Sequence, residues 1–363
     1  IVTRPHVRGC YQEAVISKIS DAAEAQTPSG FLAGLLAGLL GRFGKPSQEL
    51  IVFAIAVACF IFFAVSLQGF ASIGNIVAML RSIAILGILS TGMAVVVIGR
   101  GLDLSQVSVM AISAAWTLTL MNGGMTLFPA MALGLLFALA IGVLNGWIIA
   151  FIEIPPLFAT LATGLVCFGV GRWLLIDSVH AYPPKGADDF LFIGQGHLVG
   201  IPMPIIIFIV AAVFVHWMLS RTVVGRHIFG LGDNMLAARL MGVAVRPLII
   251  FSYAFSAFIA FIAGLTMASS VASMNTEVIN STLVFDVLLV VVLGGISLSG
   301  GRGSIVSVVV GACLIGILLN GMTILNVNSD AQNIAKSVVL LAAIVIDRRL
   351  HPKDEETDKQ GDH

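Results

Sequence analysis

Polar side chains that interrupt long apolar stretches are the residues of this chain with the best opportunity for chemistry. Asp286 lies within LVFDVLLVVVLGG, and Asn145 and Asn320 lie in Gly-rich apolar stretches. A charge at the centre of a membrane costs at least about 2.5 to 3.5 kcal/mol on insertion scales, so such a residue needs a structural or functional reason. Each of the three could take part in function, and each could instead form a structural hydrogen bond between helices.

The sequence contains no motif for hydrolysis or for metal binding. It has neither HExxH nor GxSxG, and no pair of acidic residues shares one face of an apolar stretch. Its four cysteines have no CxxC spacing, and Cys59, Cys167 and Cys313 lie in apolar stretches, where we expect them to pack as small apolar residues. We therefore expect no enzyme activity, no metal site and no cofactor.

A P-loop is also missing, because Gly44-Lys45 is followed by Pro46 and the position five residues before Gly44 is Leu39. A chain that cannot hold ATP phosphates in this way needs an ion gradient or a separate ATPase to move a solute uphill. Ion-coupled carriers usually bury carboxylates or basic relays at mid-membrane depth, and the apolar stretches here are nearly free of them. This favours a separate ATPase.

The composition identifies an integral membrane protein. Hydrophobic residues make up 58% of the 363 residues, charged residues make up 10%, and the mean hydropathy is +1.04. Soluble domains carry about 25% charged residues. The formal net charge is zero and no basic stripe is interleaved with aromatic residues, so nothing indicates a nucleic-acid partner.

The apolar stretches predict an all-α, polytopic bundle of about ten membrane helices in a transmembrane domain spanning 49–346. Helices are expected because lipid leaves no partner for free backbone groups, and the stretches lack the alternation of a barrel. The predicted spans are 50–67, 83–99, 105–121, 128–150, 157–176, 203–220, 248–271, 283–299, 304–325 and 331–346.

The distribution of positive charge predicts the orientation of these spans. With a cytoplasmic N-terminus, 15 of the 19 lysines and arginines fall on the cytoplasmic side, and Arg81, Arg172, Lys185 and Lys336 fall at the outer side. Short cytoplasmic loops of membrane proteins are enriched in Lys and Arg. Both termini are therefore expected in the cytoplasm.

One cytoplasmic segment differs from the others. Residues 222–245, within a loop spanning 221–247, read TVVGRHIFGLGDNMLAARLMGVAV, a polar and basic island between apolar stretches. Asp233 or Asn234 could be the N-cap of a short helix, and Gly242 stands where a left-handed C-cap would fall. Such a helix is too short to be stable alone, so the membrane-embedded body or a partner must hold it.

The remaining polar segments predict less. Residues 1–48 form a polar cytoplasmic segment whose apolar piece, 31–40, is long enough only for an interfacial helix. Residues 347–363 alternate acids and bases and are expected to be disordered. The outer loop 177–202 is either a solvated connector or a surface where something docks from outside.

Two glycine-rich junctions echo each other. VVVIGRGLDLS (95–105) and VVVLGGISLS (290–299) each follow an apolar stretch, which suggests duplicated halves. The glycines within and directly after the second junction, Gly294, Gly295, Gly300 and Gly301, would permit tight turns and close helix approach. Asp103 in the first junction could cap the helix that follows.

Four stretches of this chain carry a family resemblance. They are GLDLSQVSVMA (101–111), GVLNGWIIAFIEIPPLFATLAT (142–163), the island and GGISLSGGRGS (294–304). They resemble the permease subunits of bacterial ATP-binding-cassette (ABC) importers for monosaccharides, which include the ribose, xylose, arabinose, galactoside and autoinducer-2 systems. The chain departs from the family at Arg100, where glycine is usual, and at Gln106-Val107, where Val-Gly is usual.

The resemblance implies a multi-pass permease of the bacterial inner membrane. It implies three protein partners, which are a cytoplasmic ATPase, a periplasmic sugar-binding protein and a second permease copy, identical or not, besides the membrane lipid. It also implies a coupling loop that docks on the ATPase, formed by Gly225, Arg226, Gly232, Asp233, Asn234, Ala237, Ala238, Arg239 and Gly242. The small side chains of Ala237 and Ala238 would let the short helix sit close in a groove of that partner.

A monosaccharide passing such a permease would meet neutral polar groups, since a polyol needs hydrogen bonds and no counter-charge. The candidate lining residues are Asn145, Asn275, Asp286 and Asn320. Two other classes remain open. An ABC permease for branched-chain amino acids or nucleosides shares much of this plan, and an autonomous carrier or channel would transport without an ATPase.

Overall fold

A computed structural model describes residues 48–350 of the chain, with side chains described for residues 50–345. The chain divides into two compact units, Ile1–Leu50 and Ile51–His363, and the description below concerns the second. The interfacial helix predicted at 31–40 and most of the predicted N-terminal segment lie outside the described residues. Helix α15 continues to Leu350, past residue 347, and the rest of the predicted tail is likewise outside them.

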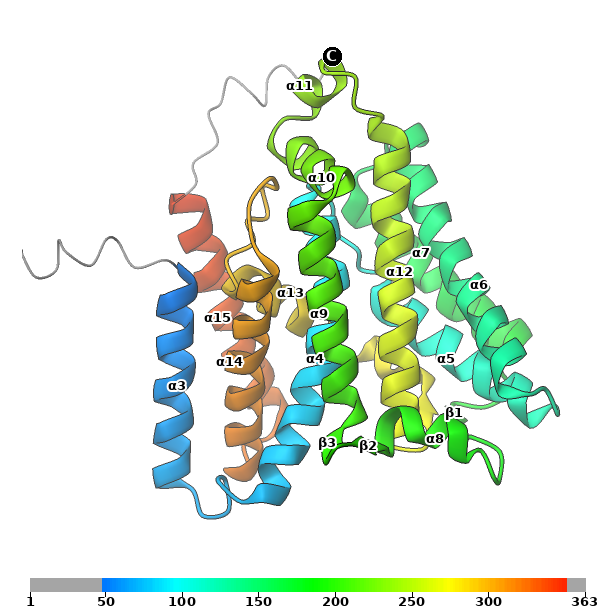
Figure 1. The fold of residues 1–363 in the computed structure, drawn as a ribbon, viewed down its shortest axis with the longest axis vertical. Helices are drawn as coiled ribbons and strands as arrows, with labels where there is room; N and C mark the ends of the chain where they lie inside the picture. The colour runs from blue at the N-terminus through cyan, green and yellow to red at the C-terminus, as the bar shows by residue number, and fades with distance from the viewer. Residues whose placement is uncertain (1–47, 351–363) are drawn as a thin grey trace, which may run out of the picture. The chain divides into compact units, whose positions relative to one another are not determined.

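Each predicted span overlaps a helix (Figure 1). The helices are α3 (Gln48–Ser66), α4 (Ile73–Ile98), α5 (Gln106–Asn122), α6 (Leu127–Trp147), α7 (Pro156–Val170), α9 (Met203–Arg221), α12 (Val245–Ser270), α13 (Leu283–Leu293), α14 (Ile305–Ile324) and α15 (Ser329–Leu350). In the part of the chain that the structure describes, six helices are long and apolar enough to cross a membrane. They are α4, α6 with the π-helical η1 (Ile148–Ile152), α7 with the π-helical η2 (Gly171–Leu175), α9, α12 and α14.

Two helix bounds differ clearly from the sequence prediction. Helix α4 begins at Ile73 rather than near residue 83, because Ser72 caps it by accepting the Asn75 N–H and the helix tolerates Arg81 in its first half. Helix α13 ends at Leu293 rather than near residue 299, because Gly294 and Gly295 close it with a left-handed turn. With 11 residues, α13 is about 16 Å long, too short to cross a hydrocarbon core of about 30 Å.

Helices α4 and α12 form the centre of the bundle. Helix α12 packs against α4, α5 and α6, and α4 packs also against α9, α13 and α14. Most of α4 and α12 is buried, whereas most of α6 and α7 is partly or fully exposed and apolar, as expected for helices that face lipid. Gly142 and Gly146 let α6 approach α12 closely, since a Cβ at Gly146 would lie 2.4 Å from the Cα of Ile250.

Short elements cover the two ends of α9 (Figure 1). Helix α8 (Asp188–Gln195) and a hairpin of β2 (His197–Leu198) with β3 (Ile201–Pro202) precede α9. Strand β1 (His180–Ala181) pairs antiparallel with β4 (Met274–Asn275), which leads into the 3-10 helix η3 (Thr276–Asn280). At the other end of α9, the island forms α10 (Val223–Asp233) and α11 (Met235–Leu240).

The loop spanning 177–202 is more ordered than a solvated connector. Phe190 of α8 is fully buried, and α8 packs against α12. The side-chain amide of Gln195 donates to the carbonyl oxygen of Ser269 at 3.1 Å, and the Ser270 hydroxyl donates to the carbonyl oxygen of Gly194 at 3.4 Å. The loop is therefore bound to the C-terminal end of α12 by packing and by two hydrogen bonds.

Candidate functional site

The island folds into two capped helices. The Thr222 hydroxyl oxygen accepts the Gly225 N–H at 3.2 Å at the start of α10, and the Asn234 side-chain oxygen accepts the Ala237 N–H at 2.9 Å at the start of α11. Asn234 is therefore the N-cap of α11, as one of the two sequence candidates predicted. The sequence prediction did not include α10, whose inward face carries Ile228 and Leu231.

Gly242 ends α11 as its sequence position predicted. Its φ is +82°, its N–H donates to the Arg239 carbonyl oxygen at 3.0 Å, and the N–H of Val243 donates to the Ala238 carbonyl oxygen at 3.0 Å. Together these bonds satisfy carbonyl groups that a helix end leaves free. Short-range capping chemistry therefore defines both ends of α11.

The side chains that α11 presents outward are not the ones the sequence suggested. Ala238 is fully buried against the protein itself, so it cannot lie in a partner's groove, and that expectation is corrected. Leu236, Leu240 and Met241 are instead 51%, 81% and 75% exposed. Leu236 and Leu240 are four residues apart and share one helix face, opposite Ala238. An apolar i, i+4 pair in a polar island was the signal that could have identified this face.

The other predicted coupling residues divide between two positions. Gly225 is buried where α10 meets α9, and a Cβ there would lie 2.2 Å from the Leu219 carbonyl oxygen. Arg226, Asp233 and Arg239 are exposed, whereas Ala237 is half-buried. The island thus combines a glycine-packed inner side with an outer side that is charged and apolar.

Gly232 connects the island to the membrane helices through backbone contacts. A Cβ at Gly232 would lie 1.9 Å from the Ile98 carbonyl oxygen and 2.4 Å from the Gly301 nitrogen. The Gly301 N–H in turn donates to that Ile98 oxygen at 2.9 Å. The end of α10, the end of α4 and the loop between α13 and α14 therefore meet at one point, which we call the glycine junction (Gly232, Ile98, Gly300 and Gly301).

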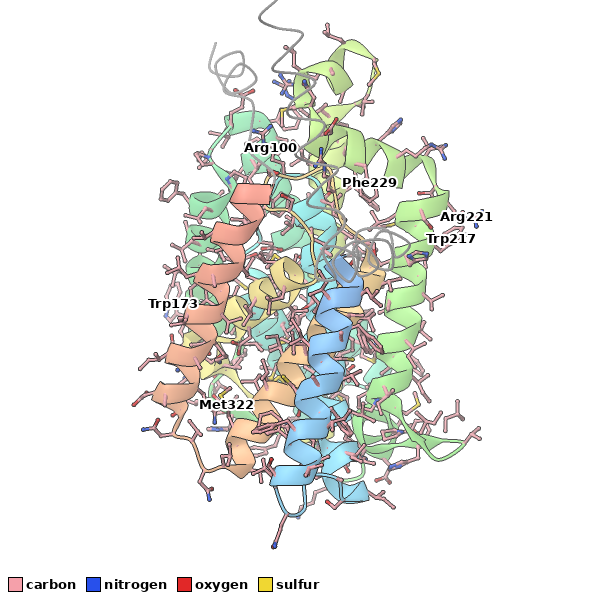
Figure 2. All side chains as sticks on the ribbon, turned by 90° about the vertical axis from the view of Figure 1, so that its left-hand side faces the viewer. Arg100, Trp173, Trp217, Arg221, Phe229 and Met322 are labelled. Carbon is pink, nitrogen blue, oxygen red and sulfur yellow. The ribbon has the colours of Figure 1, made fainter. Side chains whose placement is uncertain are left out.

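Figure 2 places Arg100 at the same end of the protein as Phe229 of α10, with Met322 toward the other end. Gly300 and Gly301 have φ of +84° and +72°, and a Cβ at Gly300 would lie 2.9 Å from the Gly232 carbonyl oxygen. Both positions therefore favour glycine, for conformation and for space. Gly300 and Gly301 thus permit a left-handed turn that lies directly against the backbone of Gly232 and Asp233.

The two echoing junctions have the same backbone closure. At the end of α4, the Arg100 N–H donates to the carbonyl oxygen of Val97, and the Gly101 N–H donates to the carbonyl oxygen of Val96. At the end of α13, the Gly295 N–H donates to the carbonyl oxygen of Val292, and the Ile296 N–H donates to the carbonyl oxygen of Val291. Arg100 and Gly295 occupy equivalent places, with φ of +67° and +89°. The sequence echo thus corresponds to a repeated helix ending, and Arg100 takes a conformation that favours glycine.

Asp103 belongs to a buried polar cluster. Its Oδ1 accepts the Ser105 N–H at 3.1 Å and the Ser105 hydroxyl at 2.6 Å, and its Oδ2 accepts the Ser256 hydroxyl at 2.7 Å. Burial raises the pKa of the Asp103 carboxyl, and the hydrogen bonds from Ser105 and Ser256 oppose that rise. Ser105 is the residue directly before α5, and Asp103 caps this start by accepting the Ser105 N–H. Through Ser256, Asp103 also joins the start of α5 to α12.

Asn145 extends this cluster to α6 and α7. Its amide nitrogen donates to the Ser105 hydroxyl oxygen at 2.8 Å, and its oxygen accepts the Thr163 hydroxyl. Gln106 lies beside the cluster and donates to the Leu89 carbonyl oxygen at 2.9 Å and to Ser256 at 3.3 Å. The cluster therefore links the first glycine-rich junction with α4, α6, α7 and α12.

The four candidate lining residues have separate partners. Asn320 and Asn75 exchange two amide hydrogen bonds of 2.9 and 3.0 Å between α14 and α4. Asn275 accepts the Glu277 N–H at 2.9 Å and so caps η3. Asp286 pairs with Lys336, an interaction that the sequence did not suggest. The structure thus does not gather Asn145, Asn275, Asp286 and Asn320 around one point.

The sequence contains three cysteines within the described residues, and all are free thiols, with Cys167 buried in α7. Cys10 lies outside those residues. Among the side chains described, no group of three His, Cys, Asp or Glu could hold a metal ion. The candidate site is therefore a structural one: the island is an exposed pair of helices, and close-packed glycines join it to the ends of membrane helices.

Comparison with known proteins agrees with a transport role. The chain is 31% identical to the ribose import permease protein RbsC of Haemophilus influenzae, over 86% of this chain and 96% of that one. It is 31% identical to the L-arabinose transport system permease protein AraH of Escherichia coli, over 85% of this chain and 92% of that one. It is 30% identical to the fructose import permease protein FruF of Bifidobacterium longum, over 75% of this chain and 77% of that one.

No solved structure matches the chain. Residues 75–346 match the family described as branched-chain amino acid transport system / permease component. This match begins in the first turn of α4 and ends within α15, so it contains the island, both glycine-rich junctions and the buried polar cluster. The chain is therefore a multi-pass membrane permease that belongs to the family of the permease components of branched-chain amino acid transport systems.

Proposed function

We propose that this protein is the permease subunit of an ABC importer that moves a monosaccharide or a related small polyol across the bacterial inner membrane. Three relatives are named for import or transport of ribose, arabinose and fructose, and they cover most of the chain. The missing P-loop supports a separate ATPase as the source of energy. The proposed protein crosses the membrane about ten times, with both termini in the cytoplasm, and the residues before and after the short helix α13 complete the crossing that contains it.

One observation carries this proposal: the glycine junction at the end of α10 directly precedes α11, which has an exposed apolar surface. Leu236, Leu240 and Met241 offer an ATPase a small apolar contact at one end of the protein. Gly232, a few residues away, touches Ile98 of α4 and Gly301 of the α13–α14 loop. A displacement of the island would therefore reach two membrane helices through backbone atoms.

The mechanism we propose is alternating access. Closure of the ATPase pair would pull α10 and α11, and the glycine junction would pass the movement to α4 and α13. The full coupling loop in this proposal comprises Gly225, Arg226, Gly232, Asp233, Asn234, Ala237, Ala238, Arg239 and Gly242. A rigid backbone contact suits this role, since packed segments transmit shifts that flexible side chains would absorb.

Other partners belong to the same proposal. A periplasmic sugar-binding protein would dock at the opposite end, where α8 and the β2–β3 hairpin cover the start of α9. A second permease copy, identical or not, would complete a path lined by neutral polar groups from the set Asn145, Asn275, Asp286 and Asn320. Of these, Asp286 borders a cavity of about 180 Å³.

Substitution of Leu240 tests the proposal. The protein would be reconstituted in liposomes with its ATPase and binding protein, and ATP-driven uptake of labelled ribose, arabinose and fructose would be measured. L240D places a charge on the exposed apolar surface and should reduce uptake at least about tenfold, the effect of losing about 1.4 kcal/mol of docking free energy. L240M keeps the surface apolar and should transport as the wild type does. Equal uptake by L240D and the wild type would remove α11 from the ATPase contact.

The family's own description supports a second candidate, import of a branched-chain amino acid. The same liposomes would be given labelled leucine with the matching binding protein. Leucine uptake without uptake of any of the three sugars would assign the protein to that candidate. Sugar efflux down a gradient with no ATP and no ATPase would instead identify an autonomous carrier.

A further inference from the structure

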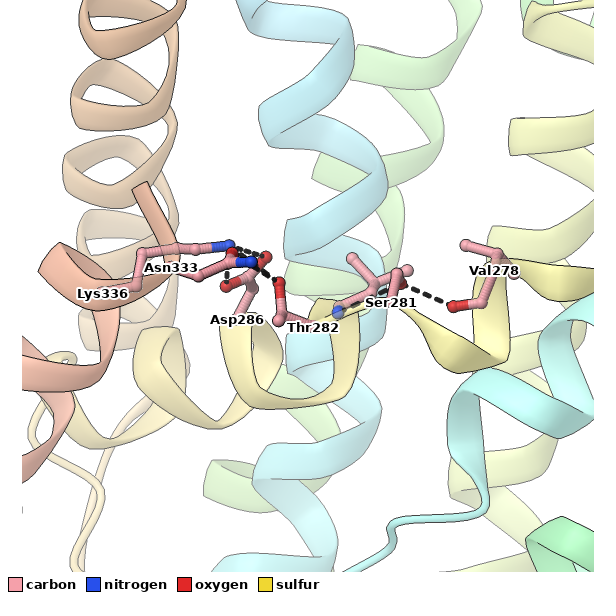
Figure 3. Close-up of polar contacts among 7 residues, drawn as sticks. Val278, Ser281, Thr282, Asp286, Asn333 and Lys336 are labelled. Atoms are coloured by element: carbon pink, nitrogen blue, oxygen red, sulfur yellow. Dashed lines mark hydrogen bonds and ion pairs between the residues drawn. The ribbon is translucent and has the colours of Figure 1, made fainter. Parts of the chain in front are cut away.

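A largely buried ion pair joins α13 to α15. The ammonium nitrogen of Lys336 lies 2.8 Å from Oδ1 and 3.0 Å from Oδ2 of Asp286, and the two side chains are 13% and 12% exposed. Lys336 also donates to the Thr282 hydroxyl oxygen at 2.9 Å, and that hydroxyl donates to the side-chain oxygen of Asn333 at 3.3 Å (Figure 3). Four polar side chains from two helices therefore converge between α13 and α15.

These side chains line a cavity of about 180 Å³, and Phe285, Leu289, Ser337 and Leu340 complete its walls. Among the described residues, neither the amide nitrogen of Asn333 nor the hydroxyl of Ser337 has a hydrogen-bond partner. The cavity is smaller than the roughly 300 to 1,000 Å³ of pockets for drug-sized ligands, which suits a molecule of about one sugar ring. Its walls combine free donors, a carboxylate and the partly exposed ring of Phe285.

The depth of the pair implies that this cavity meets water. Lys336 is seven residues beyond the start of α15, or about 10 Å along the helix. Nearby on α15, Ile334, Val338 and Leu341 are exposed and apolar, as lipid-facing residues are. A charge pair that is partly exposed at this depth would be costly against hydrocarbon, and such residues usually face a bundle interior or a wet path. The cavity therefore faces water or the interior of the assembled complex, and not hydrocarbon.

We propose that the cavity between α13 and α15, lined by Asp286, Asn333, Lys336, Ser337 and Phe285, binds the transported solute as a neutral polyol. This inference rests on the sugar-import function proposed above. Asp286 would accept hydrogen bonds from sugar hydroxyls, Asn333 and Ser337 would donate to them, and Phe285 would cover the C–H face of the ring. Because Lys336 already neutralises Asp286, no unpaired charge remains for the ends of an amino acid, so the site favours a neutral solute.

Cysteine accessibility tests whether the cavity is wet. Cys10, Cys59, Cys167 and Cys313 would be replaced by alanine, and S337C or V338C would be introduced into the complete complex in liposomes. A charged, water-soluble methanethiosulfonate should label S337C at the cavity. The neighbouring V338C, on the exposed apolar side of α15, should remain unlabelled. If S337C were unlabelled, or no faster than V338C, the proposal would be overturned whether or not the complex transports sugar.

Protection by sugar tests the binding step. Uptake first shows which of ribose, arabinose and fructose the complex carries, and a carried sugar is then added before labelling. At ten times its dissociation constant, the sugar should slow labelling of S337C about tenfold, since about one site in eleven stays free. A carried sugar that gives no protection at any concentration would refute the site while leaving the transport function intact. Absence of uptake of all three sugars would instead refute the sugar function, and the polyol site with it.

A second pair of variants separates binding from helix tethering. D286N/K336Q removes both charges, avoids an unpaired buried charge and can still form a hydrogen bond between the helices. In the S337C background it should lose sugar protection while the complex assembles and S337C is still labelled. D286K/K336D reverses the pair and keeps the tether, and it should also lose protection. Full protection in both double variants would show that the pair only holds α13 to α15.

Discussion

The Gly301 N–H donates a hydrogen bond of 2.9 Å to the Ile98 carbonyl oxygen, and the backbone of Gly232 packs directly against both residues. One backbone carbonyl at the end of α4 thereby connects the loop after α13 with the end of α10. No side chain carries these contacts. The connection therefore depends on the absence of side chains at Gly232 and Gly301.

A methyl group at position 232 should break this connection. G232A would place a Cβ 1.9 Å from the Ile98 oxygen, so the backbone must shift, and overpacking of this kind costs about 1 to 3 kcal/mol. We expect lower thermal stability and uptake that falls more than ATP hydrolysis does. G230A is the matched control, because nothing lies within 4 Å of a Cβ there and alanine favours the helix. Equal behaviour of the two variants would contradict the role of the junction.

Arg100 should be conformationally strained. Its φ of +67° costs a non-glycine residue about 1 to 2 kcal/mol, and R100A would keep that cost while removing the side chain. R100G should therefore be more stable than R100A by about 1 kcal/mol. Thermal unfolding of the two variants in detergent would measure the difference. A more stable R100A would show that the backbone there is not strained.

Ser256 should matter more than Ser252, which lies one turn away on the same helix. S256A removes a hydroxyl that donates to Asp103 at 2.7 Å, and hydrogen bonds to charged groups are worth about 1.5 to 3 kcal/mol. The Ser252 hydroxyl donates only to the Leu248 carbonyl oxygen of its own helix, so S252A should cost less than about 1 kcal/mol. Both serines are buried, so unfolding midpoints compare them directly. A larger loss in S252A would contradict the importance of the Asp103 cluster.

The paired amides of Asn75 and Asn320 should couple energetically. N75L and N320L each leave one amide without its partner, whereas the double variant removes both. Interhelical polar contacts in membrane proteins average about 0.6 kcal/mol and reach about 1.7. A double-mutant cycle of unfolding free energies should give a coupling energy in that range. A value near zero would mean that the amides find other partners.

Local features of this fold were predictable from sequence, and long-range pairings were not. Asn234 and Gly242 define α11 because caps act over three or four residues, and the repeated valines before Gly99 and Gly294 end two helices alike. The burial of Ala238 and exposure of Leu240 depend on which side of α11 meets the rest of the protein. Composition does not show this.

The pairing of Asp286 with Lys336 was hidden for the same reason. The two residues are 50 positions apart, and the span prediction treated Lys336 as an isolated charge at an outer boundary. The Asp286–Lys336 pair is set by tertiary packing, which outweighs local propensity. Helix α10 is different, because its local signal was present and was not used: Val224, Ile228 and Leu231 recur at helical spacing after the N-cap Thr222.

Helix α12 is held at both of its ends, by α8 near Ser269 and through α11 at Val243, and it has no break over 26 residues. Inserting one residue would advance its far end by about 1.5 Å and rotate it by about 100°. Either the contacts of α8 with the end of α12 or the contacts of α11 with its start would then be lost. We therefore expect α12 to tolerate no insertion or deletion. The exposed turn at Gly123 and Gly124 can instead accept added residues.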